Sequence, residues 1–327
     1  MIKGHGDDAY KYNNIVSDFS SNICKNPAAC EAVMSLLSQQ PALLAHYPEP
    51  EAWSLEKMIA EKYGVPPASV IVTNGATDAI YLIAQTFRVK HIIEETTFSE
   101  YHDASQMFPS ENNDLTCAWF CNPNNPTGTI ARTWHLAGLS KQYSYVVIDQ
   151  SYEQYIKFKG ITHAMAWRRG NVMQIHSMTK TYGVPGLRLG YIVTSFQLAE
   201  QLRKKLRPWS VSSLAIEAGK FLIQHDELKV SPDLKEAVRL RTRLNKIPNI
   251  KVNSSNTNFF LGKVQRGTAA TMKKYLAKEH HMLIRDASNF RGLTPQHFRI
   301  AAQTPAENDA LVAAIREYMN LPAIWNL

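Results

Sequence analysis

A single lysine, Lys180, lies among hydroxyl and small residues in the segment His176-Ser-Met-Thr-Lys-Thr-Tyr-Gly-Val-Pro-Gly-Leu-Arg-Leu-Gly-Tyr191. Its neighbours Ser177, Thr179 and Arg188 bring two hydroxyls and a guanidinium close to it in the sequence. A lysine amine becomes nucleophilic once its pKa is lowered, so Lys180 could form a Schiff base with a carbonyl compound while its neighbours bind a phosphate. Taken alone, the segment fits an exposed lysine in a turn between two strands equally well.

Three other segments carry residues that could join such a site. Gly75, Ala76 and Thr77 open a predicted helix directly after a strand, where backbone N–H groups favour an anion. Asp149 ends a very apolar strand, so its carboxylate needs a cation or a donor. The loop 122–128 contains two prolines and three asparagines, and such a rigid loop can present an amide side chain at fixed geometry. Each segment also has a purely structural reading, as a βα turn, a helix cap or a turn.

The elements that must position these residues alternate between short apolar strands and helices. Strands are predicted at 70–73, 91–94, 115–121, 145–149, 172–176 and 189–193, and helices at 28–39, 54–63, 76–87, 100–107 and 134–142. Continuous apolar strands alternating with helices predict an α/β fold with a mostly parallel sheet covered by helices on both faces. Ligands of such sheets bind at the carboxyl ends of the strands, where the candidate residues lie. Ser54 is the expected N-cap of its helix, and Gly64 is expected to end that helix.

The character of the sequence changes beyond about residue 198. Helices are predicted at 198–206, 213–224, 231–245, 269–279 and 305–319, and strands at 257–261, 282–285 and 297–301. This mixture predicts a smaller α+β domain. We expect a large domain over 41–234, and a small domain built from 235–327 together with an N-terminal arm over 1–40.

The composition is that of an ordinary globular protein. Of the 327 residues, 45% are hydrophobic and 20% are charged. No apolar run is long enough to span a bilayer, and the N-terminus lacks the apolar stretch of a secretory signal, so we expect a cytoplasmic protein without a membrane partner. The net charge is +8, but the one dense basic cluster, 203–207, lies on a helical pattern, where a solvated helix face is expected rather than a nucleic-acid site. A modest positive field also suits a small anionic substrate.

The four cysteines are expected to be free thiols, and no metal is expected. Cys24, Cys30, Cys117 and Cys121 form no CxxC motif. A zinc site is the alternative, but Cys117 and Cys121 fall within an apolar strand, which disfavours it.

Taken in order, these motifs resemble those of the fold-type I pyridoxal-phosphate enzymes of the class I/II aminotransferase superfamily. The resemblance rests on Asn122-Pro-Asn-Asn-Pro-Thr-Gly128, on Asp149 with Tyr152, and on Ser177 to Lys180 with Gly186 to Gly190, and it extends from about Tyr47 to Arg299. It implies pyridoxal 5'-phosphate as the cofactor.

The resemblance also implies a role for each matched residue. Lys180 would form the Schiff base with the cofactor aldehyde, Asp149 would pair with the ring nitrogen, and Tyr152 would contact the ring 3'-oxygen; these three are the expected catalytic residues. The other expected cofactor-binding residues are Gly75, Ala76, Thr77, Phe98, Asn125, Ser177, Thr179, Arg188 and Tyr47. Phe98 would stack on the ring, and Tyr47 would reach the cofactor phosphate of a neighbouring subunit, which implies a homodimer with shared sites.

The expected substrate-binding residues are His5, Asn125, Arg285 and Arg299. Arg299 would bind the α-carboxylate bidentately. Arg285, helped by His5, is the expected anchor for a substrate phosphate, and its grip would set which bond at Cα is broken.

Within the superfamily, two groups with phosphorylated amino substrates are similar to this chain. His5-Gly6, Asp18-Phe-Ser-Ser-Asn-Ile23 and Pro208-Trp-Ser-Val-Ser212 resemble the threonine-phosphate decarboxylases of cobalamin synthesis more than the histidinol-phosphate aminotransferases. Two features depart from the decarboxylase pattern: Asp7 stands where a second glycine is usual, and the chain is short.

The expected activity is therefore decarboxylation of L-threonine O-3-phosphate to aminopropanol phosphate. The first alternative is an aminotransferase acting on histidinol phosphate or an aromatic amino acid. The second alternative is a non-catalytic module that keeps the fold, which an intact Lys180 argues against.

Overall fold

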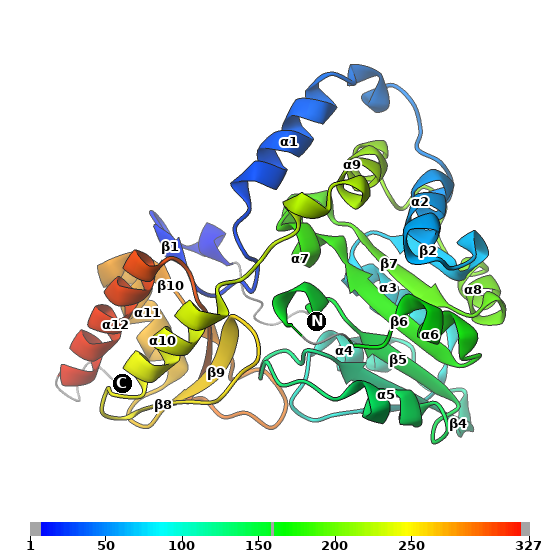
Figure 1. Ribbon diagram of the computed structural model, residues 1–327. Coiled ribbons are helices and arrows are strands. Elements are labelled where there is room, and N and C mark those ends of the chain that lie inside the picture. Colours follow the sequence, from blue (N-terminus) through cyan, green and yellow to red (C-terminus); the bar gives the residue numbers. More distant parts are fainter. Residues whose placement is uncertain (1–7, 158–159, 322–327) are drawn as a thin grey trace.

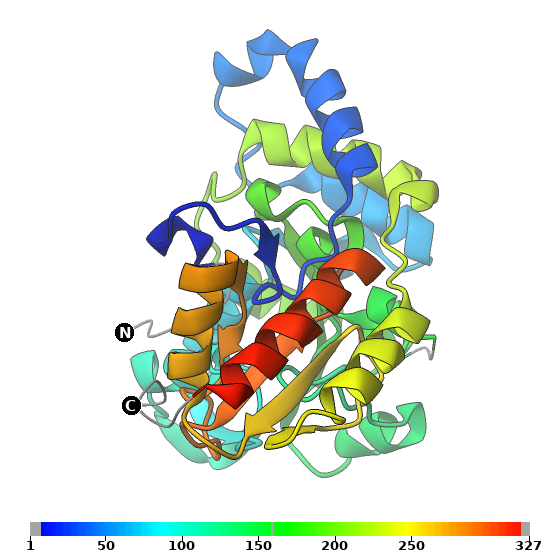
Figure 2. The ribbon, with the colours of Figure 1, turned by 90° about the vertical axis from the view of Figure 1, so that its left-hand side faces the viewer.

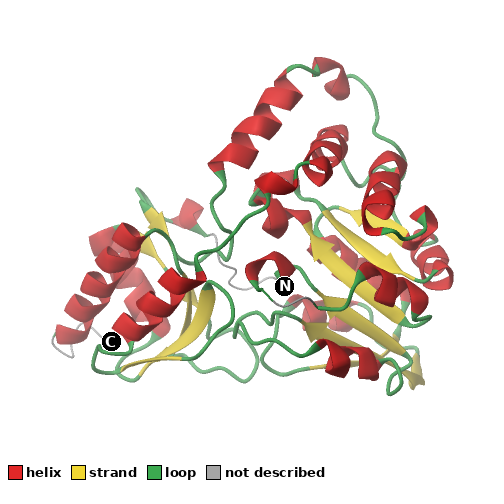
Figure 3. Ribbon diagram, in the orientation of Figure 1, coloured by secondary structure: helices red, strands yellow, loops and turns green. Residues whose placement is uncertain are grey.

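The computed structural model describes residues 8–157 and 160–321 (Figure 1). Within these residues the strands form a six-stranded sheet, a four-stranded sheet and a two-stranded pair. The two larger sheets lie side by side, each with its own helices (Figure 3).

The six-stranded sheet is mostly parallel, as predicted. Its strands, in order across the sheet, are β2 (Val70–Thr73), β7 (Gly190–Thr194), β6 (Val172–Ser177), β5 (Tyr145–Asp149), β4 (Asn112–Cys121) and β3 (Val89–Ile93). Strands β3 to β6 run parallel, while β7 is antiparallel to both of its neighbours. Strands β2, β6 and β7 are buried along their whole length, and their sequences are mostly apolar, although β6 also buries Gln174 and His176.

Helices cover both faces of this sheet, and alternate strand residues face the two layers. On one face Ile71, Val147 and Ile175 pack against α3 (Ala76–Thr86), α4 (Glu100–Met107) and α8 (Phe196–Arg203). On the other face lie Val70, Val72 and Val146. The helices of that face are α1 (Pro27–Ser38), α2 (Trp53–Tyr63), α5 (Thr133–Leu139), α6 (His163–Arg168), α7 (Met178–Tyr182) and α9 (Ser213–Gln224). The predicted α/β class is confirmed.

The four-stranded sheet is antiparallel. Its order is β11 (Arg285–Asp286), β12 (His297–Ala301), β9 (Phe259–Val264) and β8 (Ile250–Val252). Helices α10 (Leu234–Leu244), α11 (Ala269–His280) and α12 (Pro305–Asn320) pack on it (Figure 2). Short 3-10 helices complete the structure at Ala9–Lys11, Pro41–Leu44, Pro67–Ser69, Glu153–Tyr155, Pro185–Leu187 and Asp226–Leu228.

The N-terminal segment joins the half of the molecule that holds the C-terminal strands. Strand β1 (Ser17–Asp18) pairs in parallel with β10 (Met282–Leu283). The Phe19 N–H donates to the Leu283 carbonyl at 2.7 Å, and the Phe19 carbonyl accepts from the Ala301 N–H at 2.9 Å. The Phe19 ring is completely buried in the core of the four-stranded sheet. Residues distant in sequence therefore meet beside β12.

Local details differ from the sequence-based expectations. Helix α2 begins at Trp53 after Ala52, so Ser54 is not its N-cap; the Ser54 N–H instead donates to a Glu49 carboxylate oxygen at 2.9 Å. Gly64 ends the helix in a left-handed conformation, as expected. The strand predicted at 282–285 is interrupted at Ile284 and forms β10 and β11, which pair with different strands.

The proposed domain boundaries stay a prediction. Helix α1 packs against α9 in the core of the six-stranded sheet, whereas β1 belongs to the other half. Within residues 8–157 and 160–321, no helix combines the length and the apolar character needed to cross a membrane.

Candidate active site

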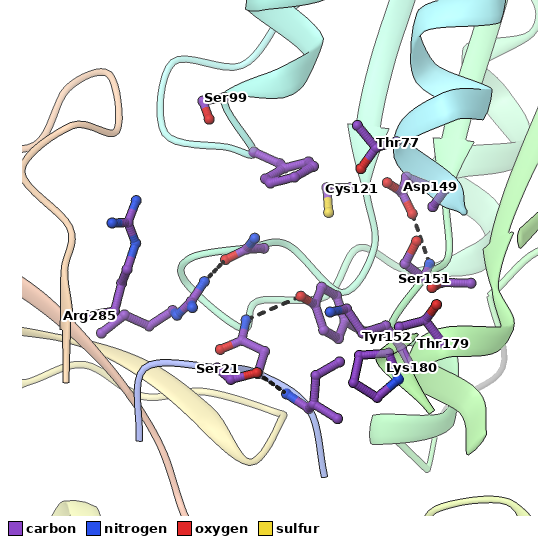
Figure 4. A pocket seen from close by; sticks show the side chains of 18 of the residues that line it. Ser21, Thr77, Ser99, Cys121, Asp149, Ser151, Tyr152, Thr179, Lys180 and Arg285 are labelled. Atoms are coloured by element: carbon purple, nitrogen blue, oxygen red, sulfur yellow. Dashed lines mark hydrogen bonds between the residues drawn. The ribbon is translucent and has the colours of Figure 1, made fainter. Parts of the chain in front are cut away.

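One cavity lies at the carboxyl ends of β4, β5 and β6, facing the four-stranded sheet (Figure 4). Cys121, Asp149 and Ser177 are the last residues of these three strands. The lining residues are Ser21, Asn22, Ile23, Ala76, Thr77, Phe98, Ser99, Cys121, Asn125, Asp149, Ser151, Tyr152, Ser177, Thr179, Lys180, Pro185, Arg188, Arg285, Phe290 and Arg299. The fold thus gathers chemically capable side chains from both halves of the chain in one place.

Lys180 enters this cavity from the short helix α7, which follows β6 directly. Its ammonium nitrogen lies 5.8 Å from the centroid of the Tyr152 ring, and the two side chains lie together at one side of the cavity in Figure 4. Arg285 lies on the opposite side (Figure 4). The turn lysine considered from the sequence is therefore a cavity lysine.

A candidate anion-binding site lies at the start of α3. Gly75 precedes this helix with φ 85° and ψ 167°, a backbone conformation that glycine adopts at little cost. A Cβ atom on Gly75 would lie 2.7 Å from Nη2 of Arg188, so the missing side chain leaves room for the guanidinium. The Thr179 hydroxyl is buried and has no hydrogen-bond partner among the described residues. This arrangement suits a phosphate, because it offers helix N–H groups, a guanidinium and a hydroxyl that can still donate a hydrogen bond.

Asp149 is 4% exposed and accepts a hydrogen bond on each carboxylate oxygen. The Tyr101 hydroxyl donates to Oδ2 at 2.7 Å, and the Ser151 N–H donates to Oδ1 at 2.8 Å. Burial, followed by the neighbouring Asp149 carboxylate, raises the pKa of the Tyr101 phenol and the pKa of the Cys121 thiol. The phenol and the thiol therefore both keep their protons near neutral pH.

The Tyr152 hydroxyl lies beside the N-terminal segment. It accepts a hydrogen bond from the Asn22 amide at 3.3 Å, and its ring packs edge-on against Tyr155 and Phe259. Burial raises the pKa of Tyr152 to about 12. Asn22 Oδ1 and Ser151 Oγ are buried without hydrogen-bond partners in the described chain.

Two buried arginines face the cavity from the four-stranded sheet. Arg285 on β11 and Arg299 on β12 are directly paired across the two strands. Arg299 donates to Asn125 Oδ1 and to the Ser20 carbonyl, both at 2.6 Å, and Arg285 donates to Asn289 Oδ1 at 2.7 Å. Burial lowers the pKa of each arginine to about 10, and for Arg299 the positive charge of Arg285 adds to this effect.

Among the described residues, no carboxylate forms an ion pair with Arg299. Its Nε atom also lacks a hydrogen-bond partner in that part of the chain. A buried cation without a carboxylate beside it favours an anionic ligand.

The structure brings most of the sequence-predicted site residues together. The predicted residues that line the cavity are Ala76, Thr77, Phe98, Asn125, Asp149, Tyr152, Ser177, Thr179, Lys180, Arg188, Arg285 and Arg299. Gly75 lies beside Arg188. Tyr47 does not line the cavity: its side chain is 87% exposed and lies next to Trp209, with ring centroids 5.8 Å apart. His5 lies outside the described residues.

Several residues at the cavity were not predicted as site residues from the sequence. The cavity is also lined by Asn22, Ser151 and Cys121. Tyr101 does not line it, but its hydroxyl donates a hydrogen bond to Asp149 from the side away from the cavity. Asn22 belongs to a segment that we used only to choose between subgroups. A close look at the residues flanking Asp149 could have suggested Ser151, but nothing in the sequence pairs Tyr101 with Asp149.

Comparison with known proteins agrees with this geometry. Residues 108–315 match the family described as aminotransferase class I and II, and the chain belongs to this family. The family uses pyridoxal 5'-phosphate, and the resemblance stated from the motifs is confirmed.

Two groups of relatives stand out. Among curated proteins, threonine-phosphate decarboxylase of Salmonella typhimurium is 26% identical over 92% of this chain and 91% of its own length. Histidinol-phosphate aminotransferase of Caldanaerobacter subterraneus subsp. tengcongensis is 28% identical over 84% of each chain.

Among solved structures, L-threonine-O-3-phosphate decarboxylase from Porphyromonas gingivalis has a TM-score of 0.89 and 34% identity, covering 94% of this chain and 100% of that one. Histidinol-phosphate aminotransferase from Sinorhizobium meliloti, in complex with pyridoxal-5'-phosphate, has a TM-score of 0.76. Its identity is 18%, over 93% of this chain and 91% of that chain, so it supports the fold alone.

Proposed function

We propose that this chain is a pyridoxal-phosphate-dependent lyase that decarboxylates L-threonine O-3-phosphate to aminopropanol phosphate, the side-chain precursor in cobalamin synthesis. Support comes from the cavity, from its two arginines, and from the decarboxylases among its relatives.

The residues of the cavity fit the cofactor. The start of α3, Arg188 and the Thr179 hydroxyl would hold its phosphate, since the hydroxyl is buried with no partner among the described residues. The Asp149 carboxylate would face the ring nitrogen, and Asn125 and Tyr152 would lie near the ring 3'-oxygen. Phe98 lines the same cavity and offers an aromatic face for stacking.

When bound, the cofactor supplies an electron sink for a bond broken at Cα of an amino substrate. The residues of the chain do the rest. Asp149 provides the negative charge that stabilises a protonated ring nitrogen. Lys180, the amine in the cavity, would move a proton to Cα. Arg299 and Arg285 would fix the substrate so that its carboxylate is held in one orientation.

The observation that carries the substrate assignment is the pairing of Arg285 with Arg299. Directly opposite residues of an antiparallel pair have Cβ atoms about 4.5–5.5 Å apart, so the two guanidinium groups start from neighbouring points of one sheet face. Such a pair suits a small substrate with two anionic groups. Threonine phosphate carries a carboxylate and a phosphate; histidinol phosphate carries only the phosphate, although 2-oxoglutarate, the keto acid of an aminotransferase, also carries two anionic groups.

The alternative is an aminotransferase acting on histidinol phosphate or an aromatic amino acid. The observation in its favour is the similar identity of the histidinol-phosphate aminotransferases to this chain. An aminotransferase needs a keto acid to accept the amino group, and a decarboxylase does not.

One assay separates the two. The purified protein, reconstituted with pyridoxal phosphate, is incubated with threonine phosphate in the absence of a keto acid, and carbon dioxide and aminopropanol phosphate are measured. We expect both products from the wild type, none from Lys180→Ala, and wild-type amounts from Lys204→Ala, a control at a lysine whose side chain is 68% exposed. Transfer of the amino group of histidinol phosphate to 2-oxoglutarate, with no carbon dioxide released, would establish the aminotransferase instead.

We further propose a cytoplasmic homodimer in which Tyr47 completes the site of the neighbouring subunit. The exposed Tyr47 side chain, beside the half-exposed Trp209, is available for such a contact. Mixing inactive Lys180→Ala with impaired Tyr47→Phe subunits tests this, because a mixed dimer has one site with both residues intact. We expect activity to be regained on mixing, and additive activities would contradict the shared site.

A further inference from the structure

Tyr101 lies directly behind the cavity wall that Asp149 forms. It is the second residue of α4, its side chain is fully buried, and its hydroxyl donates to Asp149 Oδ2 at 2.7 Å. It does not line the cavity itself. Any effect of the Tyr101 hydroxyl on chemistry in the cavity therefore acts through the groups that it contacts, of which Asp149 is the charged candidate for the cofactor ring.

The Tyr101 ring is fixed by its neighbours. It stacks on Trp119 with centroids 5.2 Å apart and meets the edge of Phe98 at 5.7 Å. The Trp119 indole N–H in turn donates to His91 Nδ1 at 2.8 Å. With the ring held on two sides, the hydroxyl is fixed beside Asp149, and a rigid donor stabilises one orientation of the carboxylate.

The charges around the hydroxyl make it a permanent donor. The titratable groups that face it are Asp149 and the Cys121 thiol, from β5 and β4. Burial raises the pKa of both the phenol and the thiol, so neither loses its proton near neutral pH. A hydrogen bond donated to a carboxylate favours its ionised form over the protonated form.

We propose that Tyr101 is a positioning residue that keeps the Asp149 carboxylate aimed into the cavity, where it would hold a proton on the ring nitrogen of the cofactor. The inference rests on the proposed cofactor and deepens the proposed function. The Ser151 N–H secures the other carboxylate oxygen, so each oxygen has one fixed donor. Without the phenol, one carboxylate oxygen loses its fixed donor, the carboxylate can turn away from the ring nitrogen, and that nitrogen would keep its proton less well.

The variant Tyr101→Phe isolates the hydroxyl, because the ring that packs on Trp119 and Phe98 is kept. Tyr318→Phe is the matched control: Tyr318 is equally buried, and its hydroxyl bonds Thr271 at 2.8 Å in the core of the other half. Both variants lose one buried tyrosine hydroxyl, but only the first loses the contact with Asp149.

The first readout is the nitrogen NMR shift of pyridoxal phosphate labelled at its ring nitrogen and bound to each variant. We expect the signal of Tyr101→Phe to move toward the unprotonated position and the signal of Tyr318→Phe to match the wild type. This readout requires no turnover. An unchanged, protonated signal in Tyr101→Phe overturns the inference whatever reaction the enzyme catalyses.

The second readout is steady-state kinetics with the confirmed substrate. We expect kcat to fall about 10- to 100-fold while KM stays within about threefold, since a hydrogen bond to a charged group is lost without any loss of a substrate contact. In an Asp149→Asn background the same substitution should have little further effect. Equal losses in both backgrounds would mean a purely structural role for Tyr101. If the wild type binds no pyridoxal phosphate, the inference falls together with the proposed function; if it binds the cofactor but releases no carbon dioxide, only the proposed reaction falls.

Discussion

Replacing Arg285 by alanine should remove the recognition of a substrate phosphate. The Arg285 side chain is buried, with 4% of the residue exposed, so its contacts with an anion form largely away from water. Each hydrogen bond between charged groups is worth about 1.5–3 kcal/mol, and a guanidinium can donate two to one phosphate. A loss of about 3–6 kcal/mol corresponds to a fall in kcat/KM of about 140- to 20,000-fold.

The assay compares two substrates that differ only in the phosphate. Decarboxylation of threonine phosphate and of threonine is followed by carbon dioxide release in the wild type and in Arg285→Ala. The full loss is expected for threonine phosphate, and a change of less than about threefold is expected for threonine, whose reaction lacks the contact. Arg291→Ala is the control, because Arg291 is exposed on the same segment and does not line the cavity.

Equal losses for the two substrates would refute the reasoning. Arg285 would then act on a part common to both, or support the fold around Phe290, whose ring lies 5.6 Å from its guanidinium carbon. An unchanged kcat/KM for threonine phosphate would equally refute it.

Two further substitutions test features outside the substrate contacts. Gly75→Ala should lower the free energy of unfolding in urea by about 1–3 kcal/mol, because the φ of residue 75 is 85°. It should also weaken cofactor binding in a fluorescence titration, because the new Cβ would displace Arg188. An unchanged stability and affinity would contradict the anion-binding role of Gly75 and Arg188. At Glu307, burial raises the pKa, but hydrogen bonds from Thr304 and Lys25 outweigh this and lower it to about 2, below the ordinary 4.5. The carboxylate therefore stabilises the fold above pH 4.5, and this stabilisation is lost as the pH falls toward 2. Glu307→Gln should lower the free energy of unfolding by about 1–2 kcal/mol near neutral pH, a value that allows for solvent screening, and by less in acid. Urea unfolding at several pH values measures this loss. A loss that does not depend on pH would contradict the role given to the Glu307 carboxylate.

The sequence predicted the large sheet well for a physical reason. Strands buried on both faces, such as β2 and β5, carry runs of apolar residues, so they are recognisable without knowledge of their partners. Strand β1 is two residues long and depends on pairing with β10, more than 260 positions away, and no local signal reveals such pairing. Ser54 is not the N-cap because the helix already begins at Trp53. The Glu49 carboxylate, from outside the helix, accepts the N–H of Ser54 in the first turn.

The site residues also divide into those with a local sequence signal and those whose contacts depend on the folded structure. Lys180, Asp149 and Arg188 were predicted because they lie at strand ends or in motifs with a fixed order. The contact between Tyr101 and Asp149 joins residues 48 positions apart through the packing of α4 on the sheet. Only the folded chain reveals such a contact, because the sequence specifies neither the rotation of α4 nor the direction of the phenol.

The attachment of the N-terminal segment to the last strands has a consequence for synthesis in the cell. Phe19 bonds Leu283 and Ala301, residues that leave the ribosome more than 260 positions after it. At about 5–20 residues per second, this partner arrives on the order of 15–60 s after Phe19. The neighbouring residues 21–23 line the cavity, so this wall closes only after β10 and β12 have been synthesised. The nascent protein can form its large sheet before these strands exist, yet it gains a complete active site only after they have been made.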